Sequence, residues 1–306
     1  METRPALSIV IPAKNEARNL QALLPAIREV RPDAEIVVVD DGSSDDTAEI
    51  ARTHGARVVR HPYSMGNGAA VKTGARAARG ETLVFMDADG QHPPALIPRL
   101  LEMLEEGYEM VVGARTAASQ AGKRRLAGNY LYNRLASLIT GHRILDLTSG
   151  FRAVRAERFR EFLYLLPNGF SYPTTITMAF FRSGYPVGYV PFHAPNRQGK
   201  SHIRLARDGL RFLLIIFRIG TLYSPLKVFF PASVLFFLGG LTLYVRAILT
   251  SGPRFTNMSA MLLMSAIVVF LIGLVAEQIT TLMYAHAAQA SQGENTHALE
   301  RRREST

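Results

Sequence analysis

The sequence predicts an α/β fold in which helices cover both faces of a mostly parallel sheet, followed by an amphipathic helix and two transmembrane helices. Three observations support this fold class. Short β-branched runs alternate with helical patterns from Leu7 to about Ala114, which is typical of β-α-β units. These runs are continuously apolar, as expected for parallel strands that are buried on both faces. Two uncharged segments near the C-terminus have the length needed to cross a membrane.

Five runs are predicted to be strands, at residues 7–11, 35–39, 56–59, 82–86 and 110–114. Helices are expected between them, at about 16–30, 45–54, 68–79 and 94–106. Ligands of open sheets of this kind bind beyond the carboxyl ends of the strands. The residues that directly follow each strand are therefore the first candidates for a functional site.

The chain is expected to contain five segments: an α/β domain at 1–200, an amphipathic juxtamembrane helix at 201–223, transmembrane helices at 226–249 and 257–284, and a disordered tail at 287–306. Charged residues recur at helical spacing within 201–223 beside apolar ones, as in a helix that lies in a membrane interface. The two spans contain stretches of 18 and 22 residues without a charge. The alternative is a buried hairpin of core helices.

The net charge of +10 arises from 35 basic and 25 acidic residues. Basic residues crowd the segment before the first span and follow the second span at 301–303. The positive-inside rule therefore predicts an integral membrane protein whose α/β domain and both termini are cytoplasmic. Because the basic residues gather beside the spans, we expect a membrane partner and no nucleic acid. The lack of cysteine excludes disulfides, thiolate nucleophiles and zinc sites built on sulfur.

The fourth predicted strand ends in two carboxylates, Asp87 and Asp89, within the run Phe85-Met86-Asp87-Ala88-Asp89-Gly90-Gln91-His92. The side chains of a strand repeat every two residues, so both carboxylates lie on one side. Two like charges this close are costly unless a cation lies between them, and Mg²⁺ is typically held by one or two carboxylates plus substrate phosphates. The run therefore predicts a metal-bound diphosphate. The alternative is a turn and capping sequence before the next helix.

Polar residues also follow the first two predicted strands. Asn15 and Glu16 come after the first strand, and Asp40 and Asp41 come after the second. Because the carboxyl ends of parallel strands meet at one edge of a sheet, we expect three strand ends to converge on one cleft. Carboxylates there can accept hydrogen bonds from the N–H groups of a base or from ribose hydroxyls. Asp45 and Asp46 are expected to cap the next helix.

A glycine cluster, Gly66-Asn67-Gly68-Ala69-Ala70-Val71-Lys72-Thr73-Gly74, opens the third predicted helix. It matches neither the dinucleotide-binding pattern nor the P-loop, because glycine is missing at the positions that each pattern requires. Two interpretations remain open. The glycines either bring backbone amides close to a phosphate or allow close packing of the helix.

The order of the motifs PAKNE, VVVDDGSSDDT, GNGAAVKTG, DADGQH and DLTSGFR resembles the family 2 glycosyltransferases. More narrowly, it resembles the dolichyl-phosphate mannose synthase and polyprenyl-phosphate glycosyltransferase branch. The resemblance covers residues from about 5 to 205, and the two spans resemble the two-helix anchor of bacterial members. It implies a GT-A fold, a nucleotide-diphosphate-sugar donor such as GDP-mannose or a UDP-sugar, and Mg²⁺ or Mn²⁺. It further implies inverting transfer of a hexose to a polyprenyl phosphate, a location in the bacterial inner membrane, and the option of a homo-oligomer.

Matched motif by motif, the resemblance also implies site residues. The donor nucleotide would be held by Pro12, Asn15, Glu16, Asp40, Asp41, Asn67 and Asp87. The metal ligands would be Asp87, Asp89 and Gln91, with Asp89 and Arg115 as the catalytic residues. The acceptor phosphate would be held by Arg115, Ser149, Arg152, Arg197, Lys200 and Ser201. For Arg197 and Lys200 the alternative is general attraction to anionic headgroups.

No catalytic base is predicted, because a lipid phosphate monoester is largely dianionic at pH 7 and can attack the anomeric carbon directly. Two other functions were weighed. One is transfer to another lipid such as diacylglycerol, and the other is a non-catalytic membrane scaffold that binds nucleotide sugars. The intact pair of Asp87 and Asp89 argues against the scaffold. The lack of tryptophan excludes the Gln-x-x-Arg-Trp element of processive family members.

Overall fold

The computed structural model describes residues 5–116, 123–169, 171–194, 217, 220–221, 223–252 and 255–304. The chain divides into two compact units, Met1–Ile203 and Arg204–Thr306. The first unit carries the predicted α/β fold and the second carries the two apolar helices. Each unit is described by itself.

The α/β unit is built on a seven-stranded sheet in the order β3-β2-β1-β4-β6-β5-β7. The strands are β1 (Leu7–Ala13), β2 (Glu35–Asp40), β3 (Arg57–Arg60), β4 (Thr82–Phe85), β5 (Met110–Arg115), β6 (Arg152–Arg155) and β7 (Val187–Phe192). Only β6 runs antiparallel, between β4 and β5. The mostly parallel sheet is therefore confirmed, with its first five strands at the predicted places, while β6 and β7 were not predicted.

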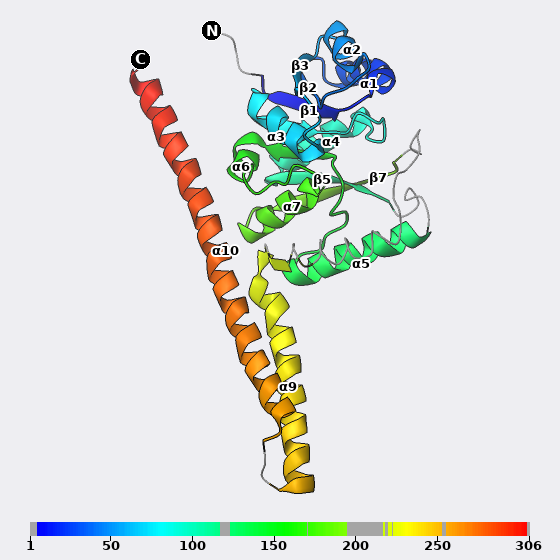
Figure 1. Cartoon of the computed structure of the whole chain (residues 1–306). Helices are drawn as coiled ribbons and strands as arrows, with labels where there is room; N and C mark the ends of the chain where they lie inside the picture. Colours follow the sequence, from blue (N-terminus) through cyan, green and yellow to red (C-terminus); the bar gives the residue numbers. More distant parts are fainter. Residues whose placement is uncertain are drawn as a thin grey trace. The chain divides into compact units, whose positions relative to one another are not determined.

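Helices cover both faces of this sheet (Figure 1). They are α1 (Ala17–Val30), α2 (Thr47–Thr53), α3 (Asn67–Ala77), α4 (Ile97–Glu105, preceded by the 3₁₀ turn Pro94–Leu96), α5 (Lys123–Thr140), α6 (Ala156–Glu161) and α7 (Tyr172–Arg182). Alternate residues of β1 face opposite sides, as the two-residue repeat requires. Ile9 and Ile11 join a core with apolar residues of α1 and α4. On the other face, α3 lies so close that a Cβ on Gly74 would stand 2.2 Å from Val10 Cγ1.

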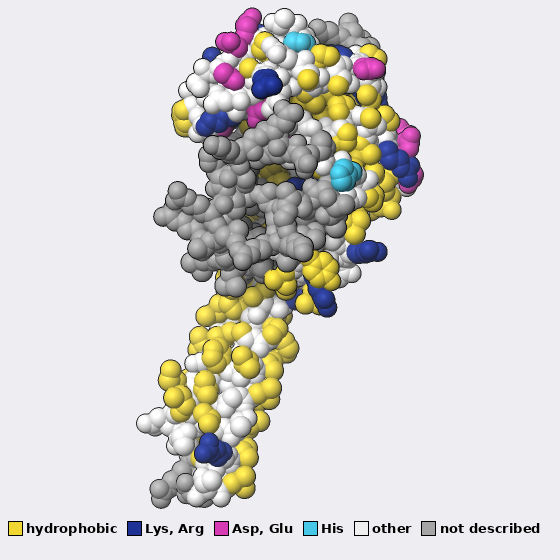
Figure 2. Space-filling view, turned by 90° about the vertical axis from the view of Figure 1, so that its right-hand side faces the viewer, with side chains coloured by type: hydrophobic (Ala, Val, Ile, Leu, Met, Phe, Trp, Pro, Cys, Tyr) yellow, Lys and Arg dark blue, Asp and Glu magenta, His cyan; other side chains and the backbone are white. Residues whose placement is uncertain are grey.

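The second unit contains two apolar helices, α9 (Pro225–Ser251) and α10 (Asn257–Glu304). Their segments Pro225–Thr250 and Asn257–Tyr284 have mean hydropathies of 2.0 and 2.6 and are long and apolar enough to cross a membrane. Only 11% and 17% of these segments are buried, which is the opposite of what core helices show. Figure 2 shows hydrophobic side chains along the outside of the hairpin. The two apolar C-terminal helices are as predicted.

Small residues and one carboxylate hold the hairpin together. A Cβ on Gly240 would lie 2.9 Å from Leu263 Cγ, and one on Gly273 would lie 2.6 Å from Phe229 Cβ. Such close approach is the usual packing of helices in lipid. At the start of α9, the Ser224 hydroxyl and the Leu226 backbone N–H donate to Glu277 Oε2 at 3.0 and 3.2 Å. Glu277 of α10 therefore caps the N-terminus of α9, where the helix dipole favours a negative charge.

Two predictions for the C-terminal third have different outcomes. The predicted amphipathic helix at 201–223 lies almost entirely outside the described residues. The tail at 287–306 was expected to be disordered, but the backbone of α10 continues as a helix to Glu304. The tail contains no proline and is rich in alanine, glutamine, glutamate and arginine. These are good helix formers, so the helix extends from the preceding span without a new nucleation step.

Candidate active site

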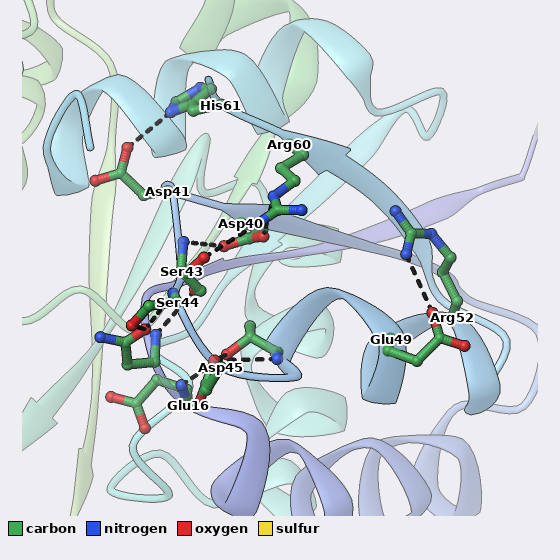
Figure 3. A network of polar contacts seen from close by, with 12 residues as sticks. Glu16, Asp40, Asp41, Ser43, Ser44, Asp45, Glu49, Arg52, Arg60 and His61 are labelled. Atoms are coloured by element: carbon green, nitrogen blue, oxygen red, sulfur yellow. Dashed lines mark hydrogen bonds and ion pairs between the residues drawn. The ribbon is translucent and has the colours of Figure 1, made fainter. Parts of the chain in front are cut away.

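The loops that follow β1 and β2 are joined by reciprocal hydrogen bonds (Figure 3). The Asn15 N–H donates to Ser43 Oγ at 2.9 Å, and the Ser44 N–H donates back to Asn15 Oδ1 at 2.9 Å. The Glu16 N–H donates to Thr47 Oγ1 at 2.9 Å. Asn15 has a φ of 56°, a left-handed conformation that asparagine tolerates better than most residues. The predicted pair Asn15 and Glu16 therefore lies directly after β1 and fixes the two loops to each other.

Asp40 is the buried end of β2 and one of the predicted nucleoside ligands. Its side chain is 0% exposed. The Ser43 N–H donates to Oδ1 at 2.8 Å, and Arg60 Nε lies 3.1 Å from Oδ2. That ion pair lacks hydrogen-bond geometry, so within the described residues Oδ2 receives no hydrogen bond. Asp40 Oδ2 is thus paired in charge with Arg60 but receives no hydrogen bond from the described residues. Pro12, another predicted ligand, is buried in β1 and pairs with Val39 of β2.

Asp41 has a different environment. Ser64 Oγ and the N–H groups of Met65 and Gly66 donate to its carboxylate at 2.8, 2.7 and 3.0 Å, and His61 Nδ1 lies 2.7 Å away. Burial alone would raise the pKa of Asp41, but these hydrogen bonds outweigh it and lower the pKa. Its acceptor sites are filled by the protein. This geometry is against the predicted nucleoside contact and instead fixes the loop before α3.

The glycine cluster at the start of α3 packs against the loop before α7. The Ala69 N–H donates to the Asn168 carbonyl at 3.1 Å. A Cβ on Gly68 would lie 2.0 Å from the Pro167 carbonyl oxygen. Lys72 Nζ donates to the Leu166 carbonyl at 3.1 Å. These contacts favour close packing over a phosphate cradle, and Asn67 lies at this junction.

Asp87 and Asp89 follow β4 and are both partly exposed, whereas Ala88 between them is 3% exposed. Both carboxylates are therefore more accessible than the residue between them, although they follow the end of β4 at Phe85 and lie outside the strand whose two-residue repeat was used for the prediction. The Gln91 N–H donates to Asp89 Oδ1 at 3.2 Å, which closes the turn. A Cβ on Gly150 would lie 3.2 Å from Asp87 Oδ2, so the Asp87 carboxylate rests on the backbone just before β6. The sequence segment around Gly150 thus reaches the acidic pair.

His92 supports this turn from the interior, which the sequence analysis did not predict. The Asp87 N–H donates to His92 Nδ1 at 2.9 Å, and the ring stacks on Phe151 at 5.0 Å. Burial lowers the pKa of His92 to about 4. The ring is therefore neutral at pH 7, with its proton on Nε2, which lies 3.8 Å from Asp87 Oδ2. The stacking partner and the donor at Asp87 orient this ring.

Arg115, at the end of β5, forms a two-pronged ion pair with Asp146. Its Nε and Nη2 donate to Asp146 Oδ2 and Oδ1 at 2.8 and 3.0 Å, and Nη2 also donates to Thr148 Oγ1 at 2.7 Å. The Asp146 side chain is 2% exposed and that of Arg115 is 27% exposed. Burial alone would raise the pKa of Asp146, but the hydrogen bonds and charge of Arg115 outweigh it and lower the pKa.

The same arginine lies within electrostatic range of the acidic pair. Burial alone would lower the pKa of Arg115, but Asp146, followed by Asp87 and Asp89, raises it. The guanidinium is therefore a fixed positive charge beside two carboxylates. Arg115 was predicted from its place after the fifth strand. Asp146 belongs to a motif that was noticed without a role being assigned to it.

Asp87 and Asp89 are chemically suited to a divalent cation, because both offer partly exposed carboxylate oxygens at one turn. Among the described residues, no three His, Cys, Asp or Glu side chains group together as a metal cage. A cation here would therefore take its other ligands from a substrate or from water. This is the common arrangement for Mg²⁺ bound with a diphosphate.

Two predicted acceptor-phosphate residues are buried instead. Ser149 and Arg152 are 1% and 0% exposed. Arg152 Nη1 donates to the Pro173 carbonyl at 3.2 Å and to Thr177 Oγ1 at 3.3 Å, and its Nη2 donates to the Ser149 carbonyl. Burial lowers the pKa of Arg152. This geometry does not favour a direct contact of Arg152 with an acceptor phosphate, because the buried guanidinium joins β6 to α7, and the acceptor role stays a prediction.

The remaining predicted acceptor residues, Arg197, Lys200 and Ser201, lie outside the described residues. Sequence reasoning also missed Tyr172, whose hydroxyl lies 3.2 Å from where a Gly150 Cβ would be. Because the same Gly150 position lies 3.2 Å from Asp87 Oδ2, the first residue of α7 lies close to Asp87. The available signal was the aromatic residue at the start of an apolar helical pattern, which by itself indicates only a core.

Comparison with known proteins identifies the families that the two parts of the chain match. Residues 8–163 match glycosyl transferase family 2, and residues 224–282 match the GtrB C-terminal hairpin. A dolichyl-phosphate hexose transferase of Haloferax volcanii is 32% identical over 199 residues, which cover 64% of this chain and 86% of that protein. An undecaprenyl-phosphate 4-deoxy-4-formamido-L-arabinose transferase of Edwardsiella ictaluri is 29% identical over 276 residues, which cover 87% and 84%.

A solved structure supports the fold. Glucosyl-3-phosphoglycerate synthase from Mycobacterium tuberculosis, in complex with Mn²⁺, UDP-glucose and phosphoglyceric acid, aligns with a TM-score of 0.58 at 24% identity. The alignment covers 71% of this chain and 80% of that one. The family match spans the sheet from β1 to β6 together with the acidic turn and Arg115, so the chain belongs to glycosyl transferase family 2.

Proposed function

We propose that this enzyme transfers a hexose from a nucleoside-diphosphate sugar to a polyprenyl phosphate, with inversion at the anomeric carbon. The observation that carries the proposal is the fixed Arg115 guanidinium beside the partly exposed pair Asp87 and Asp89. The names of relatives from Haloferax volcanii and Edwardsiella ictaluri support the lipid phosphate as acceptor. The hairpin matched at 224–282 would keep the enzyme at the membrane that contains such a lipid.

The donor would bind across the carboxyl ends of β1, β2 and β4. Asp40 Oδ2, which is paired with Arg60 but receives no hydrogen bond from the described residues, is suited to an N–H group of the base or a ribose hydroxyl. Asn15 and Asp41 would act indirectly, because their hydrogen bonds shape the loops around that oxygen. Asp87 and Asp89, with Gln91 at the same turn, would hold Mg²⁺ or Mn²⁺ together with the diphosphate. When bound, the metal would stabilise the negative charge on the departing nucleoside diphosphate.

The bond changes need no protein base. A phosphate oxygen of the acceptor forms a bond to the anomeric carbon while the bond from that carbon to the donor diphosphate breaks. A monoester phosphate is largely dianionic at pH 7, so no proton must be removed first. Arg115, held in place by Asp146, would offset the repulsion between the acceptor phosphate and the donor diphosphate.

For topology, we propose that the α/β unit and both termini lie in the cytoplasm. Arg301, Arg302 and Arg303 lie at the end of α10, beyond its apolar segment, whereas the other end of the hairpin carries only Arg246, near the end of α9, and Arg254. The bias of basic residues toward the flanks of the hairpin supports this orientation. We further propose that the membrane is a bacterial inner membrane, because the two spans resemble the two-helix anchor of bacterial family members.

The test is transfer of labelled sugar from a panel of GDP- and UDP-sugars into solvent-extractable polyprenyl phosphate. Purified full chain would be assayed with Mg²⁺, with Mn²⁺ and with EDTA. Asp89→Ala is the test variant, and Asp33→Ala is the matched control, because Asp33 is an exposed aspartate paired with Arg31 far from the turn. Transfer that requires both the metal and Asp89 supports the proposal. Transfer to diacylglycerol alone, or nucleotide binding without transfer from any donor, would overturn it.

A further inference from the structure

Arg152 of β6 is a fully buried charge whose described hydrogen-bond acceptors are all neutral. Its side chain is 0% exposed. The Ser149 and Pro173 carbonyls and the Thr177 hydroxyl accept from its Nη atoms, while its Nε has no hydrogen-bond partner among the described residues. A buried cation that is held by neutral groups alone costs stability, and such costs are tolerated mainly where they serve a site. Arg152 is therefore a candidate for a role beyond packing.

The guanidinium of Arg152 joins two segments that are far apart in the chain. Through Nη2 it holds the Ser149 carbonyl, in the loop before β6. Through Nη1 it holds the Pro173 carbonyl at 3.2 Å and Thr177 Oγ1 at 3.3 Å, both in the first two turns of α7. The Tyr172 ring, at the first position of α7, has its centroid 5.8 Å from the guanidinium carbon. Arg152 therefore fixes the loop before β6 and the start of α7 relative to each other.

Asp87 contacts these same two segments. A Cβ on Gly150 would lie 3.2 Å from Asp87 Oδ2 and 3.2 Å from the Tyr172 hydroxyl oxygen, so even a methyl group there would press on both. The Asp87 backbone N–H donates to His92 Nδ1, whose ring stacks on Phe151. The Asp87 side chain itself is 39% exposed, so it remains open to a ligand on its other side. Gly150, Phe151 and Tyr172 thus form a support for Asp87, which we call the Asp87 seat.

Metal ligands depend on the groups that orient them. Removal of a group that orients a ligating side chain typically lowers metal affinity by about 10- to 100-fold, because the ligating atom no longer lies in its bonding position. Arginine is suited to fixing such a support, because its planar guanidinium donates hydrogen bonds in several fixed directions. Lysine carries the same charge but cannot reach three acceptors with the same geometry. The contacts of Arg152 therefore meet the needs of a residue that orients Asp87 from behind.

We propose that Arg152 is a positioning residue for the metal and diphosphate site, which acts by fixing the Asp87 seat and not by contact with the acceptor phosphate. This inference rests on the proposed function, because that function gives Asp87 its role as a metal ligand. A loosened seat weakens metal binding even when no acceptor is present. A direct acceptor contact predicts instead a raised KM for polyprenyl phosphate with unchanged metal binding.

The test measures Mn²⁺ binding without turnover. The purified full chain in detergent is titrated with Mn²⁺ in the presence of UDP, and of GDP in a parallel series. Electron paramagnetic resonance follows free Mn²⁺, and the Mn²⁺ bound by the nucleotide alone is subtracted. Arg152→Lys should raise the Kd for Mn²⁺ by about 10- to 100-fold. Arg155→Lys is the matched control with an unchanged Kd, because Arg155 lies on the same strand and donates to the Leu104 carbonyl at 3.1 Å.

Gly150→Ala tests the seat without touching the buried charge. Its methyl group presses on Asp87 Oδ2, so the Kd for Mn²⁺ should rise by about tenfold. Gly169→Ala is the matched control, because a Cβ on Gly169 would meet nothing within 4 Å. The melting temperature of each variant shows whether it is folded. Wild-type Mn²⁺ binding in folded Gly150→Ala overturns the proposal, even if Arg152→Lys does not fold.

Three further outcomes separate this inference from the proposed function. Wild-type Mn²⁺ binding in Arg152→Lys, together with a raised KM for polyprenyl phosphate, overturns the inference in favour of a direct acceptor contact. A wild-type chain that binds Mn²⁺ with UDP or GDP but transfers no sugar to polyprenyl phosphate contradicts the proposed function, while the comparison of Kd values still decides the inference. A wild-type chain that binds no Mn²⁺ with either nucleotide overturns both.

Discussion

The charged groups at the carboxyl ends of β1 and β2 have a different environment from those at the ends of β4 and β5. At the ends of β1 and β2, Asp41 is saturated by donors of its own chain, and Asn15 is bonded to the neighbouring loop. At the ends of β4 and β5, Asp87 and Asp89 stay partly exposed, and Arg115 is clamped beside them by buried Asp146. Asn15 and Asp41 therefore form a structural frame, whereas Asp87, Asp89 and Arg115 keep charged atoms accessible to a ligand.

This difference teaches how to separate residues that shape the site from residues that act in it. A carboxylate with four protein donors has no acceptor capacity left for a ligand, whatever motif it belongs to. A fixed charge that remains solvent-accessible in a cleft has capacity left and is arranged before the substrate arrives. Substitutions in the frame should therefore affect stability, and substitutions of Asp87, Asp89 and Arg115 should affect turnover.

The largest effect is expected for Asp89→Asn. Loss of this charge removes a proposed metal ligand and should lower kcat/KM by at least about a hundredfold, the scale on which fixed electrostatic groups act. The melting temperature should stay near that of the wild type, because the side chain is partly exposed. Labelled-sugar transfer and thermal unfolding in detergent measure the two quantities. A large fall in melting temperature would show instead that Asp89 has a structural role.

Arg115→Lys tests whether geometry as well as charge matters. Lysine keeps the positive charge but cannot form the two-pronged contact with Asp146, so kcat/KM should fall by about ten- to a hundredfold. Arg99→Lys is the control, because Arg99 is bonded to exposed Glu102 on α4. Equal activity of Arg115→Lys and wild type would show that the clamp is dispensable.

Asp146→Asn should weaken both activity and stability, by about tenfold in kcat/KM, because Arg115 loses its ionic partner. The lowered pKa of Asp146 means that its stabilising charge is present above the ordinary carboxylate pKa and is lost only as the pH falls through the lower folded value. The melting-temperature gap between wild type and variant should therefore be constant from about pH 5 to 8 and shrink below about pH 4. A gap that shrinks near neutral pH would contradict this assignment.

His92 links the interior to the acidic turn, and its replacement separates packing from hydrogen bonding. His92→Leu removes the acceptor for the Asp87 N–H and leaves a buried donor unsatisfied, at a cost of about 1–3 kcal/mol. The concentration of Mn²⁺ needed for half-maximal activity should rise. His92→Asn, which can place an acceptor oxygen near the Nδ1 position, should bring this Mn²⁺ concentration part of the way back to the wild-type value. If both variants require the same Mn²⁺ concentration as the wild type, His92 only fills space.

The smallest effect on turnover is expected for Asp41→Asn. Its amide would face donors from Ser64 and Gly66, so the unfolding free energy should fall by about 2–3 kcal/mol. The KM for the donor, measured well below the melting temperature, should change little. Asp45→Asn is a useful comparison after the same strand, since Asp45 accepts from the Ala17 and Thr47 N–H groups. A raised KM for the donor without a fall in unfolding free energy would show that Asp41 contacts the donor.

The sequence predicted the elements whose signal is local. Strands β1 to β5 are apolar runs, and the spans are long uncharged segments, so each could be recognised within its own window. Strand β6 could not, because Arg152–Arg155 is only four residues with arginine at both ends. It is a strand because it fills the gap between β4 and β5. Strand β7 contains both glycine and proline, which weaken the pattern.

By itself, the sequence determined the fold class, the two apolar helices and the position of Asp87 and Asp89 directly after β4, because strand and helix periodicity are properties of neighbouring residues. Only the tertiary structure decided which of two motif arginines stays accessible. Arg115 meets buried Asp146 and stays accessible, whereas Arg152 is enclosed by carbonyls of distant segments. It likewise gave Asp41 four donors and left Asp40 Oδ2 with the Arg60 ion pair but no hydrogen bond. Burial and hydrogen-bond satisfaction depend on contacts far apart in the chain, so no local pattern encodes them.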